Sequence, residues 1–521
     1  MTDLAESYRD SEALRIALQS RQDSQKSSVE RNRLGQYATP TDLASDILRY
    51  AKKEMGATEI RFLDPAIGTG SFFSALLREF DSDQIDAATG FEVDPHYGAP
   101  ARHLWRDSKL RLELEDFTAL SPSGQYNLLI CNPPYVRHHH ITAATKKRLQ
   151  AASVSACGIS LSGLAGLYCH FMCLSHPWMA TSGLAAWLIP SEFMDVNYGK
   201  GLKDYLLRKV TLTHIHRFDP GDVQFADALV SSAVVWFRKS DPPPDHSVRF
   251  SYGGSLSNPR LSAMIPATAL ESERKWTRFP RAPERKSHHG PLLSHFFDVR
   301  RGLATGANDF FIMPRDKALA AGIPQEFLRP ILPSPRHLAQ DIIETDPDGW
   351  PVLDSPLGLI DCALPAEAVK RDYPEFWTYL EQGIPEVAER YLPSRRDPWY
   401  SQEKRKPPLF LSSYMGRSAA GRESPFRFIL NLSNAVATNS YLLLYPKTAL
   451  ASALDRSPDL IRAVWELLNN LPTDALTSEG RVYGGGLHKL EPKELGNVNA
   501  ESLASLVRDG GFNSEQLALL P

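Results

Sequence analysis

Residues 60–71 read Ile60-Arg61-Phe62-Leu63-Asp64-Pro65-Ala66-Ile67-Gly68-Thr69-Gly70-Ser71. The first five residues form a short apolar run typical of a strand, and a helical pattern runs from Ser71 to Phe80. The glycines between them let the backbone pass close to a ligand, and the helix N-terminus offers unpaired N–H groups to an anion. The segment therefore predicts the strand, ligand-binding turn and helix of an α/β fold.

Further strands are expected downstream of this turn. One ends near Asp94, one ends near Asp116, and residues 126–131 are an almost uninterrupted apolar run, as in a strand buried on both faces. Two more strand candidates are Leu184–Ile189 and Ser232–Phe237. Strands that alternate with helices at this spacing predict a parallel, doubly wound sheet.

Glu92 lies 24 residues after Gly68, at the end of the next expected strand. An acid at this place can accept hydrogen bonds from both hydroxyls of a ribose, so NAD is one candidate ligand. The third glycine of the dinucleotide fingerprint is missing, however, because Phe73 occupies its place. This difference favours S-adenosylmethionine (AdoMet), whose amino-acid end carries a carboxylate, over the pyrophosphate of NAD.

The tetrapeptide Asn132-Pro133-Pro134-Tyr135 follows the apolar run directly. An amine attached to an aromatic ring is a poor nucleophile, because its lone pair is delocalised into the ring. An enzyme that accepts hydrogen bonds from this amine pulls the lone pair out of conjugation and frees it for attack. The Asn132 side-chain oxygen and the Pro133 carbonyl can be the two acceptors in a loop stiffened by proline, and Tyr135 offers a flat face to an extruded base. The competing interpretation is a rigid turn without catalytic function.

The length of 521 residues predicts more than one domain. The run Asp241-Pro242-Pro243-Pro244-Asp245 indicates a border, and from about residue 290 the pattern becomes irregular. We therefore expect the following organisation: a helical arm at residues 1–30, a catalytic domain at 31–250, a linker at 251–289 and a separate α+β domain at 290–521.

The charge balance is uneven along the chain. The net charge is −3, which is unusual for a protein that binds nucleic acid, but residues 395–427 carry an excess of positive charge. Aromatic residues are interleaved with it: Trp399, Tyr400, Tyr414, Phe426 and Phe428. Lys404, Arg405 and Lys406 are therefore candidate nucleic-acid contacts, the alternative being a solvated basic face.

Several other classes of protein are disfavoured. No apolar run approaches the roughly 20 residues of a membrane span. The five cysteines contain no CxxC pair, which argues against a disulfide framework and favours the cytoplasm. Residues 138–140 are consecutive histidines, but such side chains point in different directions and have no ligand partner nearby, so no metal site is expected.

The order of these motifs resembles the gamma class of N6-adenine DNA methyltransferases, the Taq-type enzymes and their larger restriction–modification relatives. That class has a Thr-Pro motif, here at Thr39-Pro40, then the AdoMet loop, then NPPY, then a C-terminal target-recognition domain. The resemblance implies a Rossmann-like AdoMet-binding domain followed by an α+β target-recognition domain. It covers residues 31–240 with specific motifs and the remainder more loosely.

The resemblance also implies roles for single residues. Thr39 and the loop contact the methionine part of AdoMet, Glu92 holds the ribose, and Asp116 with Phe117 holds the adenine. The implied cofactor contacts are Thr39, Asp64, Pro65, Ala66, Gly68, Gly70, Glu92, Asp116 and Phe117. Phe225 is the candidate for a second aromatic contact to the flipped base, with a core phenylalanine as the alternative.

Two C-terminal segments, residues 299–308 and 481–489, are similar to parts of target-recognition domains in the larger members. Their polar residues are candidates for phosphate or base contacts. With the basic stretch included, the implied DNA contacts are Arg300, Arg301, Thr305, Asn308, Lys404, Arg405, Lys406, Arg481 and Lys489.

The resemblance thus implies methylation of the N6 amine of a flipped adenine in double-stranded DNA, bound in a cleft between two domains. It implies a monomer associated with the nucleoid and a cognate restriction endonuclease that acts separately. Three alternatives stay open. The first is that the substrate is RNA or a glutamine side chain, which other NPPY enzymes methylate. The second is a bifunctional restriction–modification polypeptide. The third is a DNA-binding subunit that kept the fold without catalysis.

Overall fold

The computed structural model describes residues 2–219, 222, 224, 231–281, 290–418, 424–483 and 486–509, with side chains from residue 11 to residue 507. The chain divides into two compact units. The first comprises residues 1–284 together with 483–485, and the second comprises residues 285–482 and 486–521. Each unit has its own hydrophobic clusters and is described separately.

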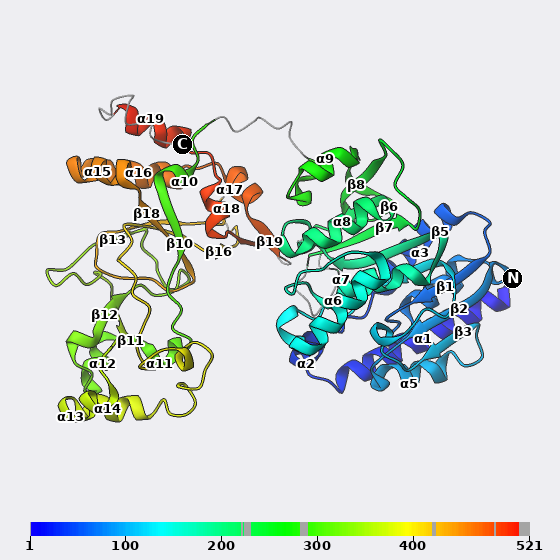
Figure 1. Ribbon diagram of the computed structural model, residues 1–521, viewed down its shortest axis with the longest axis horizontal. Helices are drawn as coiled ribbons and strands as arrows, with labels where there is room; N and C mark the ends of the chain where they lie inside the picture. The colour runs from blue at the N-terminus through cyan, green and yellow to red at the C-terminus, as the bar shows by residue number, and fades with distance from the viewer. Residues whose placement is uncertain are drawn as a thin grey trace. The chain divides into compact units, whose positions relative to one another are not determined.

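The described part of the first unit is built on a sheet of nine strands in the order β3-β2-β1-β4-β5-β7-β6-β8-β9 (Figure 1). Its strands are β1 (Ile60–Asp64), β2 (Ile85–Phe91), β3 (Leu110–Glu113), β4 (Tyr126–Cys131), β5 (Met179–Pro190), β6 (Thr211–Arg217), β7 (Ser232–Arg238), β8 (Ser247–Gly254) and β9 (Pro259–Pro266).

The sheet is mixed, whereas the sequence predicted a parallel one. Strands β3, β2, β1, β4 and β5 are parallel, but β7 is antiparallel to both β5 and β6. Strand β6 therefore points the same way as β5, and β8 runs parallel to β6. The carboxyl ends of β1, β4, β6 and β8 consequently meet at one edge of the sheet.

Helices cover both faces of this sheet. The α-helices of the first unit are α1 (Thr2–Ser24), α2 (Ser28–Leu34), α3 (Thr41–Met55), α4 (Ser71–Glu79), α5 (Pro95–Leu104), α6 (Ala143–Cys157), α7 (Leu167–Ser175), α8 (Lys200–Arg208) and α9 (Ala267–Ser272). Alternate residues of β4 separate the faces, because Leu128 packs with α3 and α4 and Leu129 packs with α7 and α8.

The predicted linker at residues 251–289 differs from what the structure shows. Strand β8, strand β9 and helix α9 continue the first unit, and β9 pairs with β8 along its whole length. The prolines at 242–244 lie in the connection between β7 and β8, so they mark a turn inside the unit. The first unit therefore extends to residue 284.

The second unit is an α+β structure. Its larger sheet has the order β10-β18-β15-β17-β13, and two three-stranded sheets accompany it within the described residues. Its strands are β10 (Phe297–Arg301), β11 (Ile312–Pro314), β12 (Leu328–Ile331), β13 (Ile342–Ile343), β14 (Leu357–Ile360), β15 (Phe410–Ser413), β16 (Met415–Gly416), β17 (Phe428–Asn431), β18 (Tyr441–Pro446), β19 (Arg481–Tyr483) and β20 (Leu487–Lys489).

Helices of the second unit pack on the larger sheet and on the smaller sheet β11-β14-β12. They are α10 (Leu293–Phe296), α11 (Asn308–Phe311), α12 (Arg315–Ala320), α13 (Ala366–Asp372), α14 (Pro374–Glu381), α15 (Thr448–Arg456), α16 (Asp459–Asn469), α17 (Thr473–Glu479), α18 (Pro492–Gly496) and α19 (Glu501–Asp509). Across the described part of both units, no helix combines the length and apolar character needed to cross a membrane.

Candidate active site

The glycine turn after β1 has the backbone conformation that its sequence predicts. Gly68 has φ +57°, and a Cβ at this position would meet no atom within 4 Å, so the backbone borders open space. Gly70 has φ +92°, and its Cβ would lie 2.6 Å from Nε1 of Trp105. That nitrogen donates to the carbonyl of Thr69 at 2.9 Å, so the turn is fixed on one side and open on the other.

Glu92 joins this turn to the end of β2. Its Oε2 accepts a hydrogen bond from Gly68 N at 2.9 Å, and its Oε1 accepts one from Asp94 N at 2.8 Å. Burial raises the pKa of the Glu92 carboxyl above its ordinary value. The acid expected to hold a ribose therefore lies beside the open backbone of Gly68.

Asp64, the last residue of β1, is a buried carboxyl with few hydrogen bonds to offset the cost of burying its charged form. Its Oδ1 accepts from Ala66 N at 3.1 Å, and burial raises the pKa of Asp64 to about 8. A buried acid whose charged form is disfavoured has unused capacity to pair with a cation. The neighbouring Pro65 is buried and Ala66 is partly exposed, so the polypeptide itself encloses the acid.

Asn132 is held in one orientation. Its Nδ2 donates to the carbonyl of Tyr37 at 2.8 Å and to Oγ1 of Thr39 at 3.1 Å. A carbonyl can only accept, so the Tyr37 contact fixes which end of the amide is the nitrogen. The opposite atom, Oδ1, is buried and has no hydrogen-bond partner among the described residues. The side chain therefore presents an unused acceptor.

The NPPY loop is held from behind by Gly35. Tyr135 N donates to the carbonyl of Gly35 at 3.1 Å, and Gly35 has φ +65°. The Tyr135 hydroxyl donates to the carbonyl of Leu188 at 3.1 Å, and its ring lies 5.6 Å from that of Tyr37. Only 8% of Tyr135 is exposed, so much of the ring that was expected to face a base is buried in the unit.

Asp116 and Phe117 follow β3 at the same edge. Asp116 is exposed, and its Oδ1 accepts from the Thr118 backbone at 2.9 Å and from the Thr118 hydroxyl at 2.7 Å. Phe117 is buried, with its ring 5.6 Å from Phe91 and 5.2 Å from Trp178. Asp116 is thus accessible to a ligand, whereas Phe117 forms part of an aromatic cluster. Phe225, the candidate second aromatic, lies outside the described residues.

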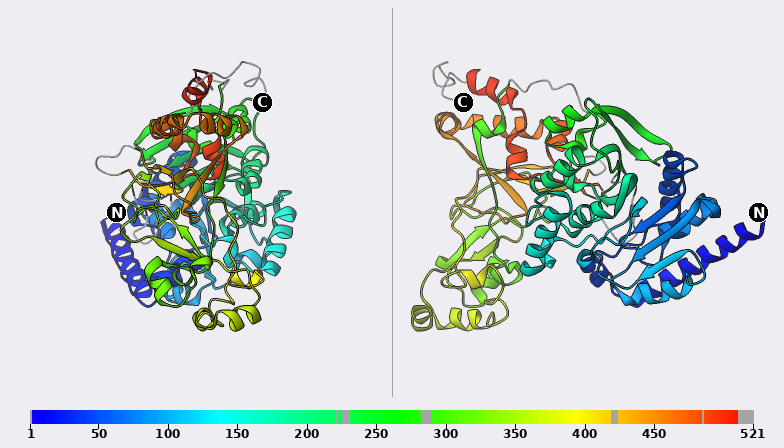
Figure 2. Two further views of the ribbon diagram at one scale, coloured as in Figure 1. Left: turned by 90° about the vertical axis from the view of Figure 1, so that its left-hand side faces the viewer. Right: turned by 45° about the vertical axis from the view of Figure 1, so that its right-hand side comes forward.

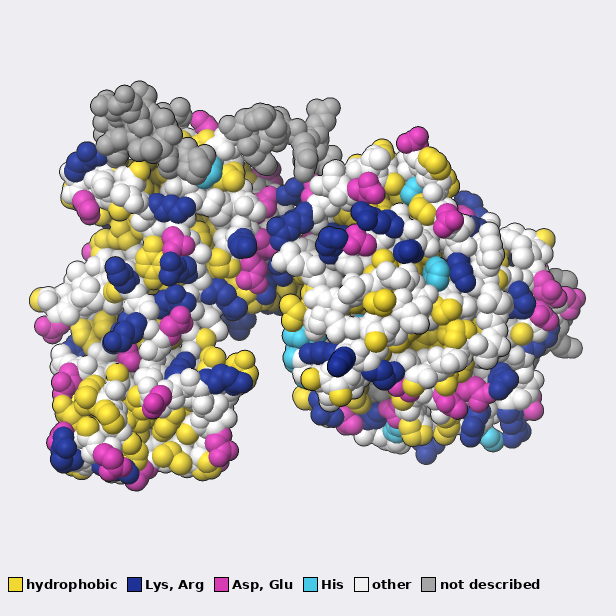
Figure 3. Space-filling model, in the orientation of Figure 1, with side chains coloured by type: hydrophobic (Ala, Val, Ile, Leu, Met, Phe, Trp, Pro, Cys, Tyr) yellow, Lys and Arg dark blue, Asp and Glu magenta, His cyan; other side chains and the backbone are white. Residues whose placement is uncertain are grey.

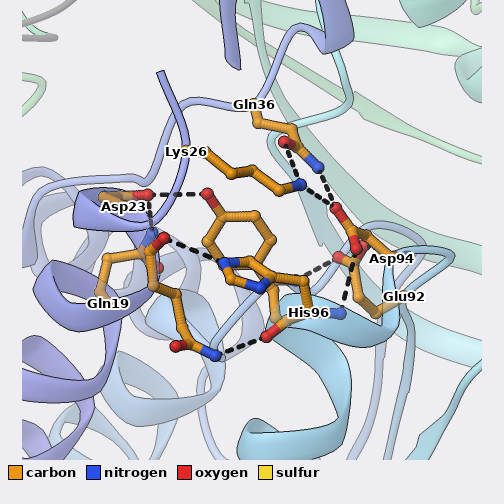
Figure 4. A network of polar contacts seen from close by, with 10 residues as sticks. Gln19, Asp23, Lys26, Gln36, Glu92, Asp94 and His96 are labelled. Carbon is orange, nitrogen blue, oxygen red and sulfur yellow. Dashed lines mark hydrogen bonds and ion pairs between the residues drawn. The ribbon is translucent and has the colours of Figure 1, made fainter. Parts of the chain in front are cut away.

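The N-terminal arm packs on the two helices that follow the glycine turn and Glu92, which the sequence did not predict. Helix α1 packs on α4 and on α5, and it lies beside α5 in the ribbon view (Figure 1). The helix begins at the N-terminus of the chain, marked in both views of Figure 2. After it, Lys26 Nζ reaches the Asp94 carboxylate and lies 3.2 Å from Oε1 of Gln36, and Gln36 Nε2 donates to Asp94 at 2.8 Å (Figure 4). Asp94 thereby connects the arm, the Glu92 backbone region and the loop that holds Asn132.

A second cluster of the arm is centred on Glu12. Its carboxylate accepts from Arg15 at 2.7 and 2.8 Å, and from the hydroxyls of Thr41 and Ser74. Burial acts to raise the pKa of Glu12, but these hydrogen bonds outweigh it and lower the pKa to about 2. Since Thr41 begins α3 and Ser74 lies in α4, one ion pair joins three helices.

We expect Glu12→Ala to destabilise the protein by about 3 kcal/mol, because Arg15, which is only 3% exposed, would keep a buried charge without its partner. A urea unfolding curve measures this loss. Glu79→Ala removes the partner of the largely exposed Arg49 and is expected to cost under about 1 kcal/mol. Because the pKa of Glu12 is lowered in the folded protein, the stabilisation that ionised Glu12 provides is fully present above pH 4.5. It is lost as the pH falls towards 2. Equal losses in the two variants would contradict the prediction.

Residues predicted to contact DNA lie in several places in the second unit. Arg300 and Arg301 are on β10 and exposed, rather than in a loop. Arg300 pairs with Asp298 at 2.7 Å, and Arg301 lies over the ring of Tyr414 at 4.2 Å. On the face seen in Figure 3, basic side chains of this unit are interspersed with acidic ones.

Four further candidates are engaged within the unit to different degrees. Arg405 pairs with Glu403 at 2.7 Å, Arg481 with Glu494 at 3.0 Å, and Lys489 with Glu491 at 2.9 Å. Asn308 is exposed, although its Oδ1 accepts from Thr305. Lys404 and Lys406 are exposed as well. These residues therefore stay candidates for DNA contact.

Two expectations for this unit do not agree with the structure. Thr305 is 1% exposed and its hydroxyl is used inside its own loop, donating to Asn308 at 2.6 Å and accepting from Ala307 N, so it cannot reach DNA as placed. The aromatic residues of the basic stretch are mostly core residues: Tyr400, Tyr414, Phe426 and Phe428 are all buried. Their spacing reflects packing rather than base stacking.

The sheet order, the open glycine turn and the acid at the end of β2 define an AdoMet-dependent methyltransferase, with AdoMet as its cofactor. Residues 75–224 match the model of the Eco57I restriction-modification methylase, and residues 283–515 match that of the Type II methyltransferase M.Eco57I, C-terminal domain. The chain belongs to this family of restriction–modification methylases and is a DNA methyltransferase.

Similar proteins extend over both units. Type II methyltransferase M.AccI of Acinetobacter calcoaceticus is 28% identical over 89% of this chain and 85% of its own. Type II methyltransferase M.XamI of Xanthomonas campestris pv. amaranthicola is 27% identical over 91% of this chain and 86% of its own. The solved Type IIL restriction-modification enzyme MmeI in complex with DNA has 12% identity and a TM-score of 0.49, over 80% of this chain and 60% of that one.

Proposed function

We propose that the chain is a site-specific DNA methyltransferase that methylates the N6 amine of an adenine flipped out of double-stranded DNA, as the modification enzyme of a restriction–modification system. The observation that carries this proposal is the unpartnered Oδ1 of Asn132, held in place by the contacts of Nδ2 to Tyr37 and Thr39. A buried acceptor without a donor is costly, and an exocyclic amine of the substrate supplies that donor.

The chemistry follows from this acceptor. The N6 amine has two hydrogens, and no described residue donates to the carbonyl of Pro133, which is the second acceptor. Hydrogen bonds to both draw the nitrogen lone pair out of conjugation with the ring and aim it at the methyl group. The loop is set before substrate binds, so little reorganisation is needed at the moment of reaction. The exposed part of Tyr135 is the contact for the extruded ring.

The residues after β1 and β2 fit AdoMet. Gly68 has open space where a side chain would block the ligand, Glu92 is placed to accept from the ribose hydroxyls, and the buried Asp64 carboxyl suits the ammonium of the methionine part. When bound, AdoMet supplies an electrophilic methyl group on a sulfonium. Thr39 contributes by orienting Asn132, and Asp116 is accessible for the adenine amine of the cofactor.

Sequencing of modified bases in DNA from cells that express the chain tests the proposal. We expect N6-methyladenine in one short sequence context, absent from cells that carry the empty vector. Methylation of cytosine, or of RNA or protein with unmodified DNA, would contradict it. AdoMet binding without turnover on DNA of any sequence would instead support the alternative of a non-catalytic DNA-binding subunit.

A further inference from the structure

A basic pocket lies at the edge of the first unit where β6 and β8 end. It is lined by Arg217, Tyr252, Thr277, Arg278, Phe279, Pro280 and Arg281. Arg217 and Tyr252 are direct partners in the register of β6 and β8. Three guanidinium groups and no carboxylate therefore line one small hollow.

Arg217 is the central group of this pocket. Its guanidinium lies over the Tyr252 ring at 4.6 Å, and that of Arg281 approaches the same ring at 5.6 Å. The Nε of Arg217 is buried and has no hydrogen-bond partner among the residues that the structure describes. Burial lowers the pKa of Arg217 from its ordinary value, although the nearby carboxylates of Asp195 and Asp219 act in the opposite direction.

The nearby acids have other partners. Asp195 accepts from the Thr277 hydroxyl at 2.7 and 2.8 Å, and Glu273 pairs with Arg278 at 3.3 Å. Asp219 pairs with Arg260 at 3.1 Å and also interacts with Tyr252 and Arg217. These carboxylates are therefore shared with other groups, while Arg217 and Arg281 both lie against the Tyr252 ring. An arrangement of forked, planar donors suits an anion with several oxygens, such as a phosphate.

The position of the pocket indicates where that phosphate comes from. Strand β6 points the same way as β4, so Arg217, the last residue of β6, and Asn132, the residue after β4, lie at the same sheet edge. Three strand spacings separate β4 from β6, which is about 14 Å. Consecutive phosphates of one DNA strand advance by about 3.4 Å along the helix axis, so this distance corresponds to about four nucleotides.

We propose that the pocket formed by Arg217, Arg278 and Arg281 binds one backbone phosphate of the DNA strand that carries the target base, a few nucleotides from that base. The inference rests on the proposed function and adds a specific anchoring site to it. The contact carries no sequence information. It fixes the position of the strand relative to Asn132, so that the flipped base is delivered to the acceptor.

The test uses the full-length protein, AdoMet and a duplex containing the methylated sequence found by base sequencing. Arg281→Gln alters an exposed pocket side chain, and Arg217→Lys keeps the charge but removes the fork and Nε. Arg106→Gln is the matched control, because Arg106 is exposed and pairs with Asp107 at the other edge of the sheet. We expect both pocket variants to bind the duplex about tenfold more weakly. The plot of log K against log salt has a negative slope, and we expect Arg281→Gln to reduce the magnitude of this slope by about one.

A second experiment identifies which phosphate the pocket binds. Duplexes that carry a single neutral methylphosphonate are scanned along the target strand, and wild type is expected to lose affinity at one position near the modified base. Arg281→Gln is expected to be insensitive at that position, with AdoMet affinity and melting temperature equal to those of wild type. Arg106→Gln keeps the wild-type profile.

Three results would overturn the inference. One is a pocket variant with the wild-type salt slope and methylphosphonate profile while DNA is still methylated, which leaves the proposed function intact. Another is tight binding of free inorganic phosphate that depends on Arg217 while DNA binding does not, which assigns the pocket to a different phosphate source. The third, unmodified DNA in the sequencing experiment, would remove the proposed function and this inference together.

Discussion

Asn132→Ala is expected to lower kcat by about 10²–10³-fold while AdoMet binds with unchanged affinity. The substitution removes the Oδ1 acceptor, and losing one preorganised group aimed at the reacting atom has an effect of this size. Within the part of the chain that the structure describes, the glycine turn, Asp64 and Glu92 form no hydrogen bond with the Asn132 side chain, so this part of the cofactor site is expected to remain formed. Single-turnover methylation and AdoMet titration calorimetry measure the two quantities.

Asn127 provides a matched control in the same strand. Its Oδ1 accepts from Arg61 N at 2.8 Å and its Nδ2 donates to the carbonyl of Glu59 at 2.6 Å, at the opposite end of β4 from Asn132. Asn127→Ala is expected to keep its turnover. Near-normal turnover in Asn132→Ala, or a loss of AdoMet affinity that accounts for its low rate, would be incompatible with the proposed role of the side chain.

Gly35→Ala is expected to reduce kcat by about 10²-fold although residue 35 contacts no substrate. The added Cβ would lie 2.3 Å from Tyr135 N and 2.7 Å from Val136 N, which are backbone atoms of the NPPY loop and its continuation. The loop must therefore shift, and a displacement of about 1 Å at a reacting group has an effect of this order. The measurement is kcat at saturating AdoMet, together with a circular dichroism melt.

Gly158→Ala separates the effect of this contact from that of backbone strain. Gly158 has φ +72°, similar to φ +65° at Gly35, and both glycines end a helix. A Cβ at Gly158 would meet only the end of the Lys209 side chain at 3.5 Å. We expect this variant to lose about 1 kcal/mol of stability and to retain turnover. If both glycine variants retained turnover, the proposed support of the NPPY loop by Gly35 would be wrong.

The strands at the centre of the sheet could be predicted from the sequence, because they are apolar on both faces. The expected boundaries Ile60–Asp64 and Tyr126–Cys131 are those of β1 and β4. Strand β6 was missed, since His214 and His216 interrupt its apolar pattern. Both histidines are fully buried and share Ser251, at 2.7 and 2.8 Å, and burial lowers the pKa of His214 to about 3, so they pack as neutral core residues.

The candidate site was predictable where one short segment supplies the chemistry, as in Asn132-Pro133-Pro134-Tyr135. It was not predictable where two distant segments meet. Gly35 contacts Tyr135 across a hundred residues of chain, and Lys26 reaches Asp94, but neither contact has a local pattern. A glycine ahead of the Thr-Pro motif was visible in the sequence, yet only the backbone contact shows why a side chain is excluded there.

The polar docking surface of the N-terminal arm has a consequence for biosynthesis. Residues 12–26 leave the ribosome before Ser74 and Asp94, the later partners of Glu12 and Lys26. An apolar helix in that interval would present an aggregation hazard. The arm instead meets its partners through Glu12, Arg15 and Lys26, which remain well solvated in the nascent chain. It can therefore stay solvated until helices α4 and α5, on which it packs, have been synthesised.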